Sequence, residues 1–201
     1  MSFYLSRPNL IIGFHGCDIS DQERLLQSDS YVKKSQNDYD WLGHGMYFWE
    51  NNYMRAIQWA KMKMGSGFVK EPVAVGAVLD LGYCLDMFDS YAIRLLKKAY
   101  KLFDEESDQV IPENKKHDKE QGEDKILRYR DCAVLEFAHK FFEKNEMKPF
   151  DSVRAAFVEG ERIYPGAGFF EKTHIQICIR NPNCIKGFFM TRKESRKFSI
   201  V

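Results

Sequence analysis

The sequence of 201 residues lacks the patterns by which most cofactor and metal sites are recognised. No G-x-G-x-x-G follows its first apolar run, no Walker lysine motif occurs, and no His and Cys residues have the spacing of a zinc site. A Rossmann-type dinucleotide fold, a P-loop enzyme and a resident metal are therefore not expected.

Charge bias and long apolar runs are also missing. Lys and Arg number 30 and Asp and Glu 29, so a net charge of +1 gives no overall attraction to nucleic acid or to a membrane. No stretch approaches the roughly 20 apolar residues of a membrane span, and the start lacks the apolar run of a signal peptide. The five cysteines include no Cys-x-x-Cys pair. We therefore expect a reduced, cytoplasmic protein that does not associate with a membrane, with an effector delivered elsewhere as the alternative.

Two helices are predicted in the first third of the chain. Residues 20–29 begin with capping residues and carry a short apolar pair, which indicates a brief helix. Residues 51–64 place apolar side chains at helical spacing, with Asn51 or Asn52 as the N-cap.

Strands are predicted at both ends of the chain. Residues 9–16 form an apolar run closed by glycine, and residues 71–87 are rich in β-branched side chains. Gly76 within the second run indicates a bulge or a close backbone approach. Three late strands are predicted at 152–160, 173–181 and 184–192.

The middle of the chain has a different pattern. Residues 90–106 and 125–145 predict two amphipathic helices, joined by a polar segment at 107–124 without apolar periodicity. The order of strands, helices and strands, without regular alternation, predicts an α+β fold. The expected organisation is a single domain over 1–201 with a helical insert at approximately 88–147.

Three short patterns carry the chemistry. His15 and Gly16 close the first predicted strand, residues 43–48 read Gly-His-Gly-Met-Tyr-Phe, and Gln176 lies in a late strand. These patterns resemble the motifs of the ADP-ribosyltransferase superfamily, in the branch with a His-Tyr-Glu triad that includes diphtheria toxin and the poly(ADP-ribose) polymerases. In that family a strand ends in His-Gly, and a Gly-x-Gly-hydrophobic-Tyr-Phe turn leads into a helix.

The resemblance implies a split β-sheet core and a site for NAD as substrate, with no metal. His15 would hydrogen-bond the adenosine ribose, the Gly16 backbone would grip the nicotinamide carboxamide, and Tyr47 would stack on the nicotinamide ring. The family places a second aromatic on the following helix; its usual spacing gives Gln58 here, so we predict the adjacent Trp59, with Tyr53 one turn earlier. The implied NAD-binding residues are His15, Gly16, Gly45, Tyr47, Ala56 and Trp59.

These residue types suit the chemistry on physical grounds. Breaking the bond between nicotinamide and ribose passes through an oxocarbenium-like state, so an enzyme has to hold the ring, orient the ribose and stabilise positive charge at the anomeric carbon. Glycines let a backbone approach a flat ring closely. We therefore expect the two glycines of the 43–48 segment to serve such an approach.

The third catalytic position departs from the family. The triad has a glutamate on the late strand, and this chain has Gln176 there, which accepts a hydrogen bond but carries no charge. The loop before this strand, which in the family recognises the target, contains Glu159, Glu161 and Glu171. Glu159 or Glu171 could activate a nucleophile as general base, and we predict His15, Tyr47, Gln176 and Glu159 as the catalytic set.

The expected function is an NAD-dependent mono-ADP-ribosyltransferase that modifies a macromolecule, RNA or protein, and releases nicotinamide. Small stand-alone members of the family suggest a toxin or anti-phage effector with an antitoxin or chaperone as partner. Basic residues crowd the final third of the chain beside Tyr164, Phe169 and Phe170, a composition that could hold single-stranded RNA.

Two other functions fit the same residues. Without a charge at Gln176 the chain could be a catalytically inactive module that binds NAD or a partner, with the helical insert as its interaction surface. It could also be a metal-independent ribonuclease with His15 and His44 as acid and base. In the plainest interpretation His15 and His44 belong to ordinary turns and Tyr47 to the core.

Overall fold

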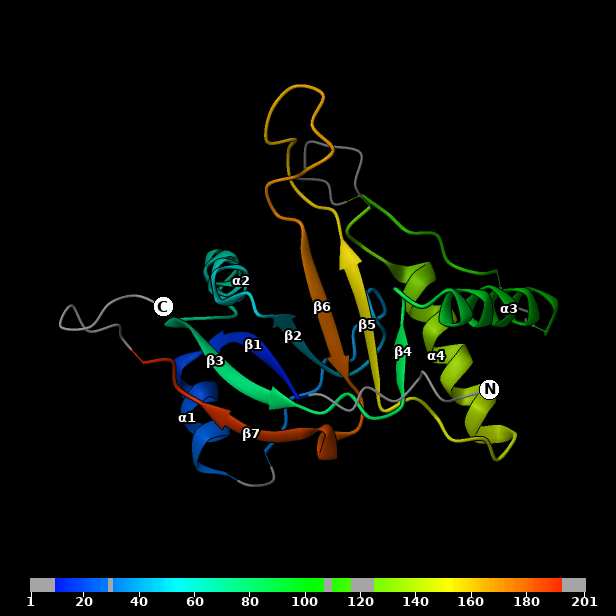
Figure 1. The fold of residues 1–201 in the computed structure, drawn as a ribbon, viewed down its shortest axis with the longest axis horizontal. Helices are drawn as coiled ribbons and strands as arrows, with labels where there is room; N and C mark the ends of the chain where they lie inside the picture. Colours follow the sequence, from blue (N-terminus) through cyan, green and yellow to red (C-terminus); the bar gives the residue numbers. More distant parts are fainter. Residues whose placement is uncertain (1–9, 29–30, 107–109, 117–124, 193–201) are drawn as a thin grey trace.

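The computed structural model describes residues 10–28, 31–106, 110–116 and 125–192. Its helices and strands, drawn in Figure 1, are β1 (Ile11–Asp18), α1 (Ile19–Gln27), β2 (Met46–Glu50), α2 (Tyr53–Gly65), β3 (Pro72–Leu79), β4 (Cys84–Asp86), α3 (Ser90–Glu106), α4 (Tyr129–Lys144), β5 (Ser152–Phe157), β6 (His174–Ile179), the 3-10 turn η1 (Pro182–Cys184) and β7 (Ile185–Phe189). The fold is mixed α+β, as the order of the sequence patterns predicts.

The strands form one hydrogen-bonded sheet of seven, in the order β4-β5-β6-β2-β1-β3-β7. Neighbouring strands are antiparallel except β4 and β5, which are parallel. The early strands β1 and β2 therefore occupy the centre of the sheet, and the late strand β6 lies directly beside β2.

The ladder between β1 and β2 is the shortest in the sheet. Within the described residues these strands share the pairs Gly13–Glu50 and Phe14–Trp49, whereas β1 and β3 pair continuously from Ile11 to Asp18. The sheet therefore consists of two wings, β7-β3-β1 and β2-β6-β5-β4, joined over a short ladder. We call the place where β1 and β2 separate, beyond Phe14 and Trp49, the seam.

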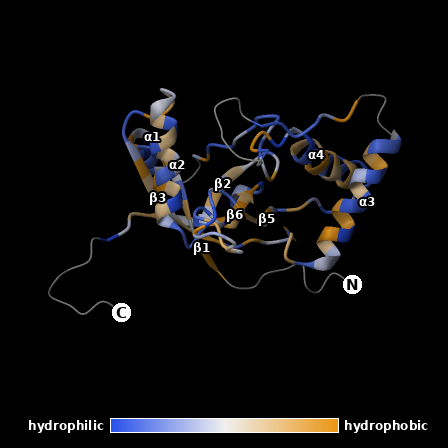
Figure 2. Ribbon diagram, turned by 90° about the horizontal axis from the view of Figure 1, so that it is seen from above, coloured by the Kyte–Doolittle hydropathy of each residue, from blue (hydrophilic) through white to orange (hydrophobic). Residues whose placement is uncertain are grey.

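Helices cover both faces of the sheet. On one face Leu25 of α1 belongs to the core cluster that includes Phe48 and Val75, and α1 packs against β1, β3 and β7. On the other face α2 lies over β1 and β3, while α3 and α4 lie over the second wing. Figures 1 and 2 show α2 on one side of the molecule, α3 and α4 on the other side, and the central strands between them.

The helices near the amino terminus confirm the sequence pattern with two differences. Asn52 caps α2, since its side chain accepts a hydrogen bond from the Arg55 amide. The helix α1 is capped by Asp18, one residue before its first turn, and the cap lies outside the predicted segment. The buried side of α2 consists of Ala56 and Ala60, and the apolar Met54 is 62% exposed.

The remaining elements agree with the sequence pattern in part. The strand predicted at 71–87 is divided into β3 and β4, which lie in different wings of the sheet, and the predicted turn at 43–48 runs into the strand β2. A Cβ at Gly76 would overlap the Phe189 ring of β7, so the close approach there is by a side chain and not by a backbone, and the irregularity in pairing falls at Val78 and Leu79. In the predicted joint, residues 110–116 contain one isolated bridge from Lys115, and the rest of that segment lies outside the described residues. No helix in the described part of the chain is both long and apolar enough to cross a membrane.

Candidate functional site

His15 is bound to Tyr47 across the seam. Its Nδ1 lies 2.8 Å from the Tyr47 carbonyl oxygen, just beyond the last backbone pair of β1 and β2. Burial lowers the pKa of His15 below its usual value, although the bond to Tyr47 acts in the opposite direction. The ring is therefore neutral at pH 7, Nδ1–H donates to the carbonyl, and Nε2 remains as an acceptor.

The backbone of Gly16 faces the same gap. The Asn51 amide donates to the Ile12 carbonyl at 2.9 Å, so every second residue of β1 from Ile12 onward points its N–H and C=O toward β2. Gly16 is the residue of this series just beyond the Phe14–Trp49 pair, and no described residue pairs with it on that side. One donor and one acceptor at a single residue complement a carboxamide.

Gly16 also has a packing requirement. A Cβ at this position would overlap the carbonyl oxygen of Ala56, because α2 crosses β1 there. Ala56 is fully buried in the same contact. These two predicted NAD-binding residues therefore set the distance between α2 and β1, and Gly16 is itself buried.

The two glycines around His44 meet packing requirements that the sequence did not predict. Gly43 has φ +74°, a conformation that favours glycine, and a Cβ there would lie 2.6 Å from Oε1 of Glu136. A Cβ at Gly45 would lie 2.5 Å from Sγ of Cys178 in β6. Both glycines are thus required by the turn and by the packing of β2 on β6.

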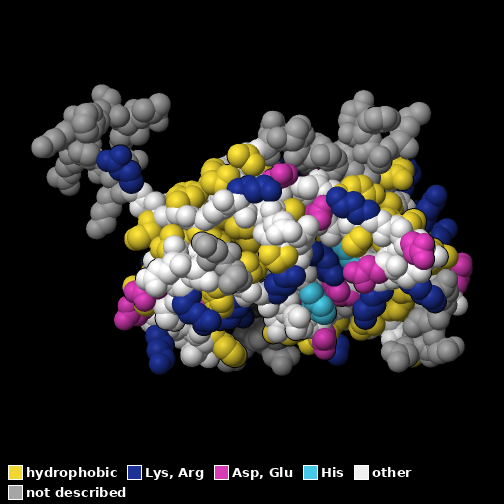
Figure 3. Space-filling model, turned by 90° about the horizontal axis from the view of Figure 1, so that it is seen from below, with side chains coloured by type: hydrophobic (Ala, Val, Ile, Leu, Met, Phe, Trp, Pro, Cys, Tyr) yellow, Lys and Arg dark blue, Asp and Glu magenta, His cyan; other side chains and the backbone are white. Residues whose placement is uncertain are grey.

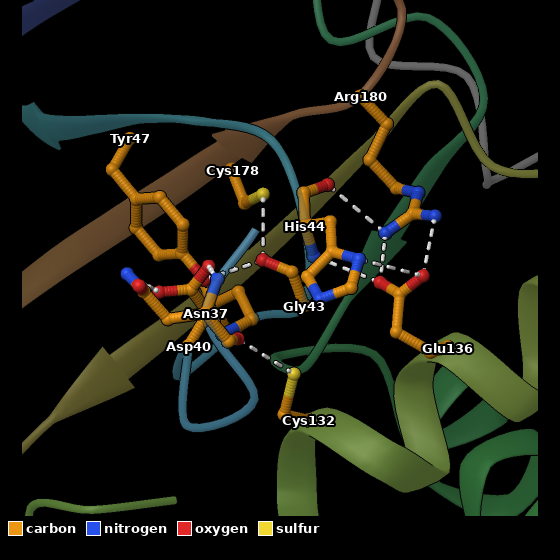
Figure 4. Close-up of polar contacts among 10 residues, drawn as sticks. Asn37, Asp40, Gly43, His44, Tyr47, Cys132, Glu136, Cys178 and Arg180 are labelled. Atoms are coloured by element: carbon orange, nitrogen blue, oxygen red, sulfur yellow. Dashed lines mark hydrogen bonds and ion pairs between the residues drawn. The ribbon is translucent and has the colours of Figure 1, made fainter. Parts of the chain in front are cut away.

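Tyr47 is anchored to the turn that precedes it. Its hydroxyl donates to the Gly43 carbonyl at 2.7 Å and accepts from the Leu42 amide at 2.8 Å (Figure 4). Burial raises the pKa of Tyr47 well above its usual value. The half-buried Tyr47 packs against the core cluster of the second wing, and because its hydroxyl is already bonded, only its ring is left for stacking.

Gln176 lies on the same sheet face as Tyr47. It pairs with Trp49 of β2 on one side and Ala155 of β5 on the other, and it is 9% exposed. Its carboxamide makes no hydrogen bond to any other described residue. Gln176, the predicted third catalytic residue, therefore lies opposite Trp49, which follows Tyr47 by two residues in β2. Its carboxamide is available to hydrogen-bond a ligand.

A group of aromatic and charged side chains adjoins Gln176. The Trp59 ring of α2 lies 5.7 Å from that of Trp49. Glu159 forms an ion pair with Arg55 of α2 at 2.7 Å, and its carboxylate lies 3.7 Å from Nδ1 of His174. The structure thus brings the predicted residues Trp59, Glu159 and Gln176 together around Trp49, beside the seam.

Polar atoms in this group lack partners. Nε1 of Trp49, Nε of Arg55 and Nε2 of His174 are buried and form no hydrogen bond within the described part of the chain. The His174 Nδ1 lies 2.6 Å from the Lys172 carbonyl and burial lowers the pKa of His174, so its Nε2 is an unprotonated acceptor. Buried polar atoms without partners are rare in proteins, so these three call for a water molecule or a ligand as partner.

Sequence reasoning missed Arg55, His174 and Trp49. Two of them could have been found from the sequence, because alternate residues of a strand lie on the same face. Trp49 shares a face with Tyr47 on β2, and His174 shares a face with Gln176 on β6. Arg55 immediately precedes the predicted Ala56, but its pairing with Glu159 depends on how the loop after β5 folds back.

The charge distribution is mixed. On the face seen from below in Figure 3, basic, acidic and hydrophobic side chains are interspersed. No three His, Cys, Asp or Glu residues form a group that could hold a metal ion in the part of the chain that is described. Two basic residues of the final third are used internally, Arg154 with Glu50 and Asp86, and Arg180 with Glu136.

Comparison with known proteins finds one distantly similar sequence. No family model and no solved structure matches the chain. An uncharacterized protein of Methanocaldococcus jannaschii is 28% identical over 190 residues, which cover 86% of this chain and 83% of the archaeal protein. The similarity thus extends over most of both chains.

Proposed function

We propose that this chain is an NAD-dependent mono-ADP-ribosyltransferase with an ADP-ribosyltransferase-like split-sheet core. The observation that carries the proposal is the seam. There β1 and β2 separate, the His15 side chain bridges them, and the Gly16 backbone has an unpaired donor and acceptor on its β2 side. This arrangement supports the binding of a flat amide ring, as the resemblance implies.

The geometry supports a role for each residue of the seam. The nicotinamide carboxamide would bind the Gly16 N–H and C=O, with the Tyr47 ring against the nicotinamide. The neutral His15 offers Nε2 to a hydroxyl of the adenosine ribose. Tyr47 is immobilised by its hydroxyl, so stacking on it requires little further loss of side-chain freedom.

The transfer step needs a base and stabilisation of positive charge. The C1'–N bond breaks, its electron pair leaves with nicotinamide, and the acceptor's nucleophilic atom bonds to C1' and releases a proton. Gln176 accepts a hydrogen bond from the ribose, and Glu159 supplies the missing negative charge and takes the proton. Arg55 holds the Glu159 carboxylate beside this face of the sheet.

The acceptor is a macromolecule, RNA or protein. The internal pairing of Arg154 and Arg180 removes two residues from the basic tract that could bind RNA. We retain both acceptor classes in the proposal, together with a role as a cytoplasmic toxin or anti-phage effector controlled by an antitoxin or chaperone.

The test is nicotinamide release from labelled NAD by the purified protein, with RNA and protein fractions offered separately as acceptors. Release is expected, with label moving into one fraction. Glu159→Gln should lower the rate about a hundredfold or more. Glu161→Gln, on the same loop and exposed, is the matched control and should leave the rate unchanged. Absence of NAD binding would end the proposal.

A second function is favoured by the uncharged Gln176: an inactive module that binds NAD or a partner. It predicts NAD binding without release, and a gain of release in Gln176→Glu. An active parent that loses its activity in Gln176→Ala would contradict it.

A further inference from the structure

Glu136 of α4 reaches out of the helical insert and into the turn before β2. Its Oε1 accepts a hydrogen bond from the His44 amide at 2.8 Å. Arg180, at the end of β6, donates to both carboxylate oxygens and, through Nη1, to the His44 carbonyl at 3.0 Å. Figure 4 shows the carboxylate between Arg180 and the turn.

The turn is constructed around this carboxylate. Gly43 has a positive φ, and the space its Cβ would occupy is taken by Oε1 of Glu136. The Glu136 and Arg180 side chains are 15% and 18% exposed, so their charges are largely shielded from water. Burial acts to raise the pKa of Glu136, but hydrogen bonds from Arg180 and His44 outweigh it and hold the pKa below its usual value. The carboxylate is therefore ionised at neutral pH.

The same turn holds Tyr47. The Gly43 carbonyl accepts from the Tyr47 hydroxyl, and the Tyr47 carbonyl in turn accepts from His15. A continuous set of bonds thus runs from Glu136 through the turn to Tyr47 and across the seam. Glu136 itself lies on a different element from the seam residues, and its hydrogen bonds within the described part of the chain go to His44 and Arg180, not to His15, Gly16 or Gln176.

We infer that Glu136 is a positioning residue for the transfer reaction, which fixes the Tyr47 ring through the Gly43–His44 turn. The inference rests on the proposed function and extends the site to the helical insert. Without the carboxylate the turn loses its main cross-link, and Tyr47 moves with it. Because displacement of about 1 Å at a reacting centre can cost on the order of a hundredfold in rate, the effect should fall on kcat.

The experiment compares Glu136→Gln with Glu143→Gln, a change of the same kind at an exposed position of the same helix. Steady-state nicotinamide release gives kcat and KM, and circular dichroism at the assay temperature gives the folded fraction. We expect Glu136→Gln to lower kcat about thirtyfold with KM for NAD changed less than about threefold, while Glu143→Gln matches the parent. Arg180→Lys keeps the charge but loses the fork of donors, so its kcat should be intermediate.

Hydrogen exchange of the segment 41–47 provides a second measurement that does not need activity. The His44 amide should exchange about tenfold faster in Glu136→Gln than in Glu143→Gln. A parent that releases nicotinamide, with equal kcat in both variants or with a loss explained by the unfolded fraction, would overturn the inference and leave the proposed function intact. A parent that releases none removes the proposed function, and the inference with it, whatever the exchange rates.

Discussion

Tyr47 is held at two points. Its hydroxyl satisfies the Leu42 amide and the Gly43 carbonyl, and its own carbonyl receives the His15 side chain. The pattern Gly-x-Gly-hydrophobic-Tyr-Phe predicted that this residue matters, but it assigned the glycines to a ligand. The structure assigns them to the turn and to β6, because the contact with Glu136 and Cys178 is made by residues far away in the sequence.

Tyr47→Phe tests this anchoring. The change keeps the ring but leaves the Leu42 amide and Gly43 carbonyl without their partner, which should lower the free energy of unfolding by about 1–3 kcal/mol. Urea denaturation measures it, and Tyr164→Phe, at an exposed position of the β5–β6 loop, is the control. Equal stability of the two variants would mean that water replaces the hydroxyl without cost.

The buried His139 should make the protein less stable at acid pH. Burial lowers the pKa of this α4 histidine to about 3, and the nearby Arg180 adds to the shift. Its pKa in the unfolded chain is about 6.5, so the unfolded state binds the proton first as pH falls. The contribution of neutral His139 to the free energy of unfolding is fully present above pH 6.5. Between about pH 6.5 and pH 3 the free energy of unfolding should decrease by about 1.4 kcal/mol per pH unit.

Urea denaturation at pH 7 and pH 5, on the parent and on His139→Leu, checks this. Leucine fits an apolar site beside Phe150 and does not titrate, so the variant should lose about 2 kcal/mol less than the parent between the two pH values. Parallel behaviour of both proteins would assign the acid sensitivity to other groups.

The helix α2 connects fold and site. It places Trp59 and Arg55 beside β2 and β6, and its distance from the sheet is set where Ala56 meets Gly16. Its existence and its Asn52 cap were predictable, since both depend on local sequence. The side of α2 that faces the sheet was harder to predict. It consists of small alanines, whose hydrophobicity is weaker than that of the exposed methionines Met54 and Met64.

A pair of glycine substitutions tests the helix position. Gly16→Ala forces a methyl group against the Ala56 carbonyl, so α2 has to shift, and we expect a loss of about 2 kcal/mol or more in unfolding free energy. Gly65→Ala, at the end of the same helix with open space around it, should stabilise by about 0.5–1 kcal/mol. Thermal unfolding distinguishes them, and a stable Gly16→Ala protein would show that the contact can relax.

The sheet as a whole could be predicted only in part. The four helices and the strands β1, β3, β5, β6 and β7 follow from apolar patterns that lie within each segment, whereas β2 lies in a segment predicted as a turn and β4 was not separated from β3. The strand order does not, because the position of β6 between β2 and β5 depends on pairings such as Trp49 with Gln176, which are 127 residues apart (176 minus 49). The association of Glu159 with Arg55 and of Glu136 with the turn has the same long-range origin.

Because β1 and β2 separate at the seam, neighbouring amides of β1 should differ in their protection from hydrogen exchange. The N–H groups of His15 and Cys17 point toward β3, while that of Gly16 points into the seam. In the free protein the Gly16 amide should therefore exchange about tenfold or more faster than its neighbours, and NAD should slow it selectively. Nuclear magnetic resonance measures the three amides in one experiment. Equal protection of all three, or no selective change with NAD, would contradict the proposed contact.

The parallel pairing of β4 with β5 has a consequence for shortening the chain. Parallel neighbours cannot be joined by a hairpin, because the chain has to return to the starting end of the sheet before the next strand begins. The helices α3 and α4 make that return, so they form an obligatory crossover and not an appendage. A miniaturised version that replaced them with a tight turn could not keep this strand order.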